Sequence, residues 1–244
     1  MLAHSGPAAY ETQDMLGKYL LMHFCTDEEI AQAVPGNIPQ VMHLPLRCAQ
    51  LVSGFTNQKN RALDLGCAVG RSTFELAREF AEVCGIDYSR EFIAAAIQLK
   101  QHGRLEYWQK DSGDNGKTRI AITPQVDRSR VSFQQGDATA LPSSLHGFDA
   151  VLLANVLCRL PDPVACLSRM DKLVTPGGVL VMTTPFSWLP EYTPREHWID
   201  GIQGVAAQLP EFELLHTEEI PFLIREHARK FEYIITLASV WRRK

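Results

Sequence analysis

The feature that most constrains the fold is a short apolar stretch that runs into a turn containing two glycines. Ala62–Leu65 is apolar apart from the carboxylate of Asp64, which is typical of a buried parallel strand. Gly66 and Gly70 bracket the turn, and Ser72–Phe80 has apolar residues at helical spacing. Glycine lets a ligand approach the backbone, and a helix N-terminus favours a negative group. The stretch therefore predicts a nucleotide-binding strand, turn and helix.

The glycine spacing indicates which nucleotide is bound. A dinucleotide site requires G-x-G-x-x-G, but Ala68 and Arg71 occupy two of those glycine positions, which disfavours an NAD-dependent oxidoreductase. The pattern present, Asp-x-Gly-x-x-x-Gly, resembles the first motif of the class I S-adenosylmethionine-dependent methyltransferases, where the glycine loop cradles methionine and adenosine. The resemblance implies that this segment binds the cofactor through Asp64, Gly66, Cys67, Ala68, Gly70 and Arg71, with Arg71 near the cofactor's carboxylate.

Polar residues also end the next predicted strands. Val83–Asp87 ends on an acid 23 residues after Asp64, where it is placed to accept hydrogen bonds from ribose hydroxyls. Val131–Asp137 and Phe148–Asn155 read as the third and fourth strands, and Gly-Asp-Ala at 136–138 resembles the passage that sets an acid near the adenine. Ligands of open parallel sheets bind outside the carboxyl ends of the strands. Further cofactor residues are therefore expected there: Asp87, Tyr88, Gly136, Asp137, Ala138, Asn155 and Val156.

The remaining segments complete an α/β fold with a Rossmann-like, seven-stranded, mostly parallel sheet and an antiparallel last strand. A helix is expected after Ser89, and another from Pro161 to the Pro-Gly-Gly at 176–178. Val179–Thr184 is predicted to be the fifth strand, and 212–222 and 231–241 the closing antiparallel pair. The chain is expected to be one methyltransferase domain, 1–244, with its core at 61–244.

Two segments fall outside this core. Residues 1–60 predict a helical lid: 1–9 disordered, helices at 10–24 with Thr12 as N-cap, 27–33 and 45–55, and a turn at 35–39. Residues 102–130, after the second core helix, predict an inserted hairpin near the active-site rim, pairing 105–108 with 118–123.

Composition limits the classes of partner. Lys and Arg number 24 against 28 Asp and Glu, a net charge of −4 with no basic run, so nucleic acid is not the expected partner. Six scattered cysteines without a C-x-x-C pair predict free thiols and a cytoplasmic protein. No apolar run of membrane-spanning length, no signal peptide and no metal-ligand spacing are visible, so membrane and metal are not expected.

Three segments carry a closer resemblance: Asp64–Ser72, Thr184–Trp198 and Leu214–Glu226 followed by Arg229–Phe231. Together they resemble the C-terminal methyltransferase domain of the ovothiol-biosynthesis enzyme, the family of 4-mercaptohistidine N1-methyltransferases. The resemblance runs from about Tyr10 to the C-terminus. It implies methylation of an imidazole nitrogen of 5-thiohistidine to give ovothiol A, with the sulfoxide synthase of the same pathway as a partner.

The substrate side is less determined. An imidazole is neutral near pH 7, so an acceptor that fixes its tautomer suffices, and Glu11, Tyr192 and Glu226 are the catalytic candidates, with His23 and His43 as rivals. Arg47 and Arg225 are candidate carboxylate clamps, with structural ion pairs as the alternative. Further substrate contacts are expected from Tyr19, His23, Phe186 and Trp188. Methylation of another carboxylate, phenol or thiol, or a non-catalytic cofactor-binding module, stays open.

Overall fold

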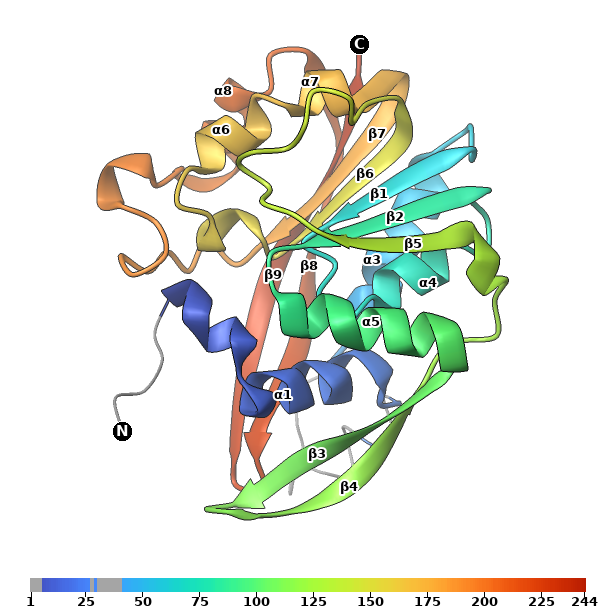
Figure 1. The fold of residues 1–244 in the computed structure, drawn as a ribbon. Coiled ribbons are helices and arrows are strands. Elements are labelled where there is room, and N and C mark those ends of the chain that lie inside the picture. The colour runs from blue at the N-terminus through green and yellow to red at the C-terminus, as the bar shows by residue number, and fades with distance from the viewer. Residues whose placement is uncertain (1–5, 27–28, 30–40) are drawn as a thin grey trace.

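A seven-stranded sheet forms the centre of the molecule, in the order β5-β2-β1-β6-β7-β9-β8 (Figure 1). The computed structural model describes residues 6–26, 29 and 41–244. Neighbouring strands from β5 to β7 run parallel, whereas β9 is antiparallel to both β7 and β8, which confirms the predicted fold class. The strands are β1 (Arg61–Leu65), β2 (Glu82–Asp87), β5 (Val131–Gln135), β6 (Phe148–Ala154), β7 (Val174–Thr184), β8 (Phe212–His227) and β9 (Lys230–Arg243).

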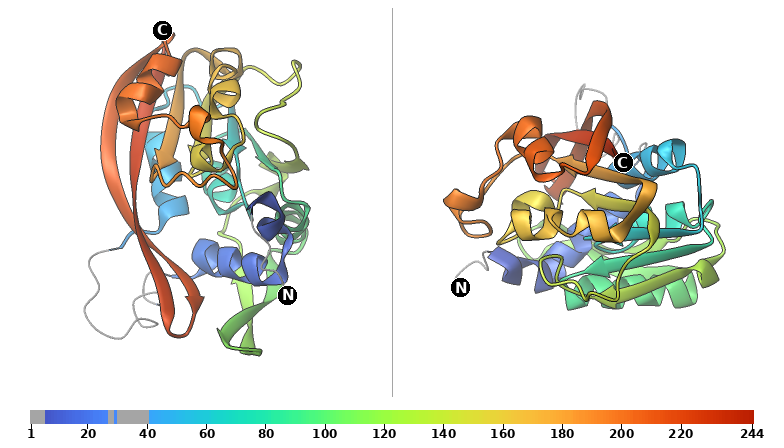
Figure 2. Two further views of the ribbon diagram at one scale, coloured as in Figure 1. Left: turned by 90° about the vertical axis from the view of Figure 1, so that its left-hand side faces the viewer. Right: turned by 90° about the horizontal axis from the view of Figure 1, so that it is seen from above.

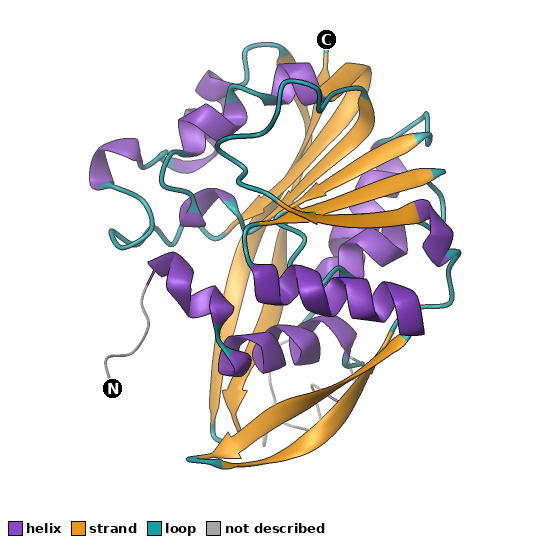
Figure 3. Cartoon of the chain, in the orientation of Figure 1, coloured by secondary structure: helices purple, strands orange, loops and turns teal. Residues whose placement is uncertain are grey.

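Helices cover both faces of this sheet (Figure 3). On one face lie α3 (Leu44–Phe55), α4 (Arg71–Leu76) and α5 (Arg90–His102), and on the other α6 (Pro163–Leu167), α7 (Met170–Leu173) and α8 (Gly201–Gln208). Side chains of a strand alternate between faces, so Leu152 joins one hydrophobic cluster and Val151 the other. This explains why β6 is apolar apart from Asp149. Within the described ranges, no helix is long and apolar enough to cross a membrane.

The N-terminal segment consists of a 3₁₀ helix, η1 (Gly6–Glu11), and helix α1 (Gln13–Phe24). Thr12 is the N-cap, as predicted, because its Oγ1 accepts from the Met15 amide at 3.3 Å, and α1 therefore begins at Gln13. Disorder was expected through residue 9, but 6–9 belong to η1. Of the helix expected at 27–33, only Glu29 is described, and the turn at 35–39 lies outside the described residues.

The insertion is a two-stranded antiparallel sheet of β3 (Arg104–Ser112) and β4 (Asn115–Ile122), as predicted. Figure 2 shows it below α1. Helix and hairpin meet closely at Gly17, where a Cβ would lie 2.3 Å from the Trp108 carbonyl oxygen. The expectation that this hairpin borders the active site is wrong, since none of its residues lines the cavity described below. It supports α1 instead.

Several boundaries differ from the predicted ones. The helix expected from Pro161 is divided into α6 and α7, and Val174 already pairs with Phe148 in the sheet. The Pro-Gly-Gly at 176–178 therefore forms a bulge within β7 rather than ending a helix. Helix α4 ends at Leu76, four residues early, and α8 was not expected. Short 3₁₀ turns are η2 (Arg128–Arg130), η3 (Leu157–Arg159) and η4 (Arg195–His197).

Candidate active site

A cavity of about 330 Å³ opens where the parallel strands end and the N-terminal helices cross them. Most of the predicted cofactor residues line it: Asp64, Gly66, Cys67, Ala68, Asp87, Tyr88, Gly136, Asp137, Ala138, Asn155 and Val156. Of the residues predicted to meet the substrate or to act in catalysis, Tyr19, His23 and Tyr192 line it as well. The other predicted site residues lie outside its wall and are treated below.

The glycine turn brings backbone to the cavity where a side chain would obstruct it. Gly66 has a φ of 81°, and a Cβ there would lie 2.0 Å from the Val156 Cγ2. The turn is tied to β2, because the Gly66 and Cys67 amides donate to the Ile86 carbonyl at 2.7 and 3.0 Å. Gly70 also has a left-handed backbone, but its missing side chain makes room for the Phe133 ring, so its role is structural.

Asp87 connects the glycine turn with the next helix. Its Oδ2 accepts from the Ala68 amide at 2.8 Å, and its Oδ1 accepts from the Ser89 amide at 2.9 Å. Burial raises the pKa of this carboxyl to about 6, against the lowering effect of the Ser89 and Ala68 amides. Each oxygen keeps a further lone pair, so the side chain is placed to accept from two vicinal hydroxyls.

Two further carboxylates lie on the sheet side of the cavity. Asp64 is only 1% exposed, and the Thr73 hydroxyl donates to its Oδ2 at 2.7 Å. Burial raises the pKa of Asp64 to about 7. Asp137 accepts from the amide and the hydroxyl of Thr139 through the same oxygen, Oδ1, at 2.8 and 2.7 Å. These acids favour a ligand that brings hydrogen-bond donors or positive charge.

Asn155 presents a fixed amide at the end of β6. Its Oδ1 accepts from the hydroxyls of Thr183 at 2.8 Å and Thr236 at 2.6 Å, and its backbone amide donates to the Thr183 carbonyl at 2.9 Å. The residue has a φ of 56°, a conformation that asparagine tolerates well. Because both hydroxyls donate to the oxygen, the Asn155 Nδ2 is left as a donor on the cavity wall.

Another part of the cavity wall is aromatic and includes one arginine. Tyr10 lies 6.0 Å from the Tyr19 ring and 6.1 Å from the Tyr192 ring, and the Arg159 guanidinium lies 5.2 Å from the centre of the Tyr192 ring. Burial raises the pKa of Tyr192 to about 12, so its phenol is neutral at pH 7 and acts as a hydrogen-bond donor rather than a base. Tyr10 and Arg159 were not predicted.

His23 joins this wall from α1 as a neutral imidazole. Burial, followed by the charges of His43 and Arg71, lowers the pKa of His23 to about 3. Its Nδ1 is buried and has no hydrogen-bond partner among the described residues. His43 instead caps α3, where its Nδ1 accepts from the Leu46 amide at 3.4 Å. A histidine with so low a pKa is a poor base but remains a site for hydrogen bonding.

The two predicted carboxylate clamps are wrong. Arg47 donates from Nε and Nη2 to both carboxylate oxygens of Glu218, each at 2.6 Å. Arg225 donates to Asp111 at 2.6 Å and to the Lys110 carbonyl at 3.0 Å. Neither arginine lines the cavity. The alternative of structural ion pairs holds for both, because a carboxylate from a distant part of the chain already occupies each guanidinium.

Several other predicted residues also face elsewhere. Glu226 pairs with Lys230 at 2.8 Å, which lowers the pKa of this carboxyl to about 2 and makes it a poor base. Glu11 accepts from the amide at the start of α5, at Arg90, at 3.1 Å. Arg71 donates to Glu75 at 2.9 Å and to the His23 carbonyl at 3.2 Å, not into the cavity.

The aromatic residues after β7 are arranged differently from the predicted wall. Phe186 and Trp188 pack against the core on the α8 side of the sheet, and Trp188 stacks on Trp198 with ring centres 6.4 Å apart. Pro185 and Ser187, which alternate with them in the sequence, line the cavity instead. The segment thus borders the cavity through its small residues and its backbone.

The residues at the strand ends fit S-adenosylmethionine. A Cβ at Gly136 would lie 2.8 Å from Ile86, and one at Gly66 2.0 Å from Val156, so both glycines let these apolar side chains of the cavity wall pack against the backbone. Ile86, Ala138 and Val156 give an apolar slot for a purine ring, and Asp87 and Asp137 keep free acceptors beside it. These residues would hold the adenosine, and Asp64 would lie near the positive charges of the methionine.

Comparison with known proteins agrees with this site. Residues 63–182 match the family model described as a methyltransferase domain. The ubiquinone biosynthesis O-methyltransferase of Methylococcus capsulatus is 30% identical over 142 residues, which are 57% of this chain and 49% of that protein. The chain spans about half the length of the curated relatives it matches.

Solved structures show the same fold at low sequence identity. The N-methyltransferase NodS of Bradyrhizobium japonicum WM9, in complex with S-adenosyl-L-homocysteine, is 18% identical with a TM-score of 0.52, covering 93% of this chain and 98% of that one. The [4+2]-cyclase SpnF is 17% identical with a TM-score of 0.55, covering 96% and 97%. The chain therefore has the Rossmann-like methyltransferase fold, and its matched segment and strand-end residues fit S-adenosylmethionine as the cofactor.

Proposed function

We propose that this protein transfers a methyl group from S-adenosylmethionine to an imidazole nitrogen of 5-thiohistidine, giving ovothiol A. The observation that carries the proposal is the division of one cavity into an acidic wall at the strand ends and an aromatic wall with Arg159. The segments Thr184–Trp198 and Leu214–Glu226, which resemble the thiohistidine methyltransferases, add support. When bound, the cofactor supplies a methyl group on a sulfonium, which the ring nitrogen takes as the imidazole loses one proton.

The chain's own residues bind and orient the reactants. Tyr10, Tyr19 and Tyr192 provide flat apolar surface for an imidazole, and their hydroxyls can donate to a thiolate. The fixed Nδ2 of Asn155 is a second donor, whose direction the threonine hydroxyls set. A positioned ring with the correct tautomer needs no strong base. Residues of η1 and α1 line the cavity, where they would shield the bound reactants from water.

Other small-molecule acceptors are the main alternative. The curated relative in Methylococcus capsulatus is an O-methyltransferase, whose cofactor half would look the same. A phenol or carboxylate acceptor would also suit an aromatic cavity. The fold by itself does not decide the reaction, since the cyclase SpnF shares it. The remaining alternative is a module that binds the cofactor without catalysis. As a partner of the proposed enzyme, we propose the sulfoxide synthase of the ovothiol pathway.

Mass spectrometry tests the proposal directly. The purified protein is incubated with S-adenosylmethionine and 5-thiohistidine, and histidine and unrelated thiols serve as controls. The expected product is thiohistidine that has gained one methyl group on a ring nitrogen, with fragmentation excluding the sulfur. Methylation of a control compound alone would reject the substrate. Tight cofactor binding without any methylation would favour the binding module.

A further inference from the structure

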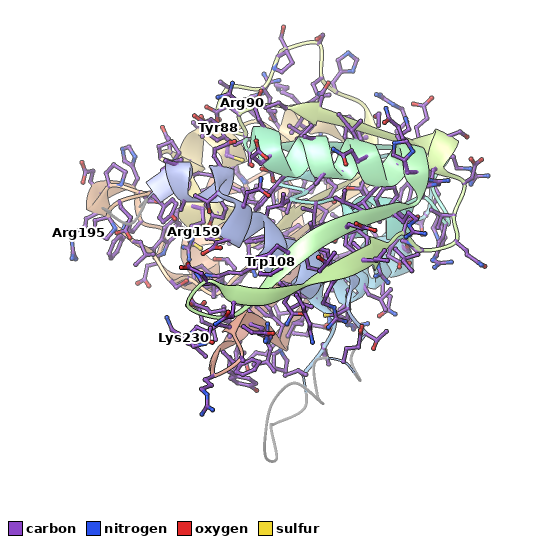
Figure 4. The ribbon with its side chains drawn as sticks, turned by 60° about the horizontal axis from the view of Figure 1, so that its bottom comes forward. Tyr88, Arg90, Trp108, Arg159, Arg195 and Lys230 are labelled. Atoms are coloured by element: carbon purple, nitrogen blue, oxygen red, sulfur yellow. The ribbon has the colours of Figure 1, made fainter. Side chains whose placement is uncertain are left out.

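The cationic residue of the aromatic wall, Arg159, has no role in the proposed binding of the cofactor. Among the described residues that line the cavity, Arg159 is the one with a permanent positive charge. It follows Asn155 by four residues, at the end of the short turn η3, so the same strand end positions both side chains. Figure 4 shows Arg159 further in than Arg195, which lies at the outer edge of the molecule.

The Arg159 guanidinium is held by one of its nitrogens. Nη1 donates to the Ser187 carbonyl at 2.8 Å and to the Cys158 carbonyl at 3.0 Å, and the group lies over the Tyr192 ring. In the described part of the chain, no carboxylate forms an ion pair with it. A partly buried cation without an anionic partner is unfavourable unless a ligand supplies the anion.

The edge of this guanidinium formed by Nε and Nη2 has the geometry that carboxylates require. Within the described ranges, the bonds of Arg159 to Ser187 and Cys158 all come from Nη1, and the Tyr10 hydroxyl is a further group that interacts with the guanidinium. Arg47 uses the equivalent Nε and Nη2 edge for its two bonds to Glu218. A carboxylate that approaches Arg159 from the cavity would meet the same pair of donors.

We propose that Arg159 binds the carboxylate of the substrate, so that the enzyme selects a small aromatic amino acid over the corresponding amine. This inference rests on the proposed function and names the substrate group that the cavity recognises. The neighbouring Tyr10 hydroxyl, which interacts with Arg159, Tyr19 and Tyr192, adds a donor beside the carboxylate. The aromatic part of the substrate then lies against the tyrosines.

The cofactor also carries a carboxylate, so the two sources must be distinguished. Arg159 bonds to the Ser187 carbonyl and lies over the Tyr192 ring, both of which follow β7, whereas the glycine turn is tied to β2 through the Ile86 carbonyl. The 3₁₀ helix η1 joins the two sides, because the Tyr10 carbonyl accepts from the Ser89 hydroxyl, next to Asp87, at 3.0 Å. We therefore assign the Arg159 edge to the substrate. A loss of S-adenosylhomocysteine affinity in an Arg159 variant would instead assign it to the cofactor.

The test uses pairs of compounds that differ by the carboxylate alone. Binding to the protein saturated with S-adenosylhomocysteine is measured by calorimetry for 5-thiohistidine and its decarboxylated amine, and for the pairs histidine and histamine, and tyrosine and tyramine. In the native protein, at least one acid should bind about 30-fold or more tightly than its amine. In Arg159→Met this ratio should fall to within about threefold, with S-adenosylhomocysteine affinity also changed by less than about threefold.

Two further variants control for structural effects. Arg159→Lys keeps the charge but loses the two-pronged geometry, so it should recover part of the ratio. Arg195→Met removes a similar guanidinium from outside the cavity, where Arg195 lies 4.9 Å from the Trp198 ring centre, and should leave the ratio unchanged. For the turnover of thiohistidine, Arg159→Met should raise KM with little change in kcat.

The outcomes separate this inference from the proposed function. Absence of methyl transfer to thiohistidine would reject the proposed function, yet a carboxylate preference that Arg159→Met removes would still uphold the Arg159 assignment. Equal binding of every acid and its amine by the native protein would overturn the assignment. The assignment would also be overturned if Arg159→Met kept the native preference for the acid. It would be overturned as well if the variant lost as much affinity for S-adenosylhomocysteine as for the acid.

Discussion

Replacing Asp64 with asparagine tests whether this buried carboxylate strengthens cofactor binding while it destabilises the folded protein. The substitution keeps the shape of the side chain, and the amide oxygen can still accept from the Thr73 hydroxyl. What it removes is a negative charge at a position that is 1% exposed and has no cationic partner within the described structure. Stability and cofactor affinity should therefore change in opposite directions.

The magnitude and its sign follow from the pKa of Asp64, which rises from an ordinary value of 3.8 to about 7 on folding. Between those values the folded protein holds the proton more tightly than the unfolded chain, so ionisation destabilises the fold as the pH rises. At about 1.4 kcal/mol per pH unit, the full cost above pH 7 is at most about 4 kcal/mol. Near pH 5 it is about 2 kcal/mol, and it vanishes near pH 4.

Urea unfolding followed by tryptophan fluorescence measures this difference near pH 5 and near pH 8. Without cofactor, Asp64→Asn should be more stable than the native protein, and its advantage should grow by up to about 3 kcal/mol over that interval. The variant should also bind S-adenosylhomocysteine more weakly near pH 8, because the charge facing the methionine group is lost. A stability difference independent of pH, or a less stable variant near pH 8, would refute the reasoning.

Asp149→Asn is the matched control for the same chemical change. Asp149 is also buried on the sheet, but its Oδ2 accepts from the backbone amides of Asn60 and Arg61 at 2.8 and 3.2 Å. An asparagine there loses charge-assisted bonds without removing a strained charge, so it should destabilise the protein near pH 8 by about 1 to 3 kcal/mol. Opposite signs at the two positions would identify Asp64 as the functional carboxylate.

Three further changes test the glycine turn, the ribose acceptor and the rejected clamp. Gly66→Ala should destabilise the protein by about 1 to 3 kcal/mol in thermal unfolding, because its Cβ meets Val156 in a left-handed backbone, and Val156→Ala should restore only the steric part. Asp87→Asn should weaken S-adenosylhomocysteine binding about tenfold or more in calorimetry. Since the pKa of Asp87 is about 6 without ligand and hydroxyl donors favour its ionised form, affinity for cofactor in the native protein should fall as the pH drops through 6. Arg47→Met should leave the substrate KM unchanged and lower the stability by about 1 kcal/mol, because its ion pair with Glu218 is lost. A raised KM would show that Arg47 binds the substrate carboxylate after all.

The cofactor half could be predicted from sequence because its determinants are local. Asp64 and Asp87 each end an apolar run, and parallel strands necessarily bring such ends together. The turn glycines are specified within five residues of one another. Gly70 and Arg71 were still assigned wrongly, since a sequence does not show which side of the turn faces the ligand. Gly70 faces the Phe133 ring, and Arg71 bonds to Glu75.

The substrate half depends on contacts that sequence does not reveal. Arg47 and Glu218 are 171 positions apart, and Arg225 and Asp111 are 114 apart, so their ion pairs become visible only in the folded chain. Arg159 was missed because nothing near it in the sequence marks it as a ligand contact. Its one signal is its place four residues after Asn155, at the end of a predicted strand. Tyr10 is brought to it only by the packing of η1.

A crystal structure of the protein with S-adenosylhomocysteine and 5-thiohistidine tests the division of the cavity most directly. We expect the ribose hydroxyls on Asp87, the imidazole against the tyrosines with a ring nitrogen facing the cofactor sulfur, and the amino-acid carboxylate on Nε and Nη2 of Arg159. A carboxylate bound to Arg47 or Arg225, or a cofactor whose own carboxylate occupies Arg159, would contradict this expectation.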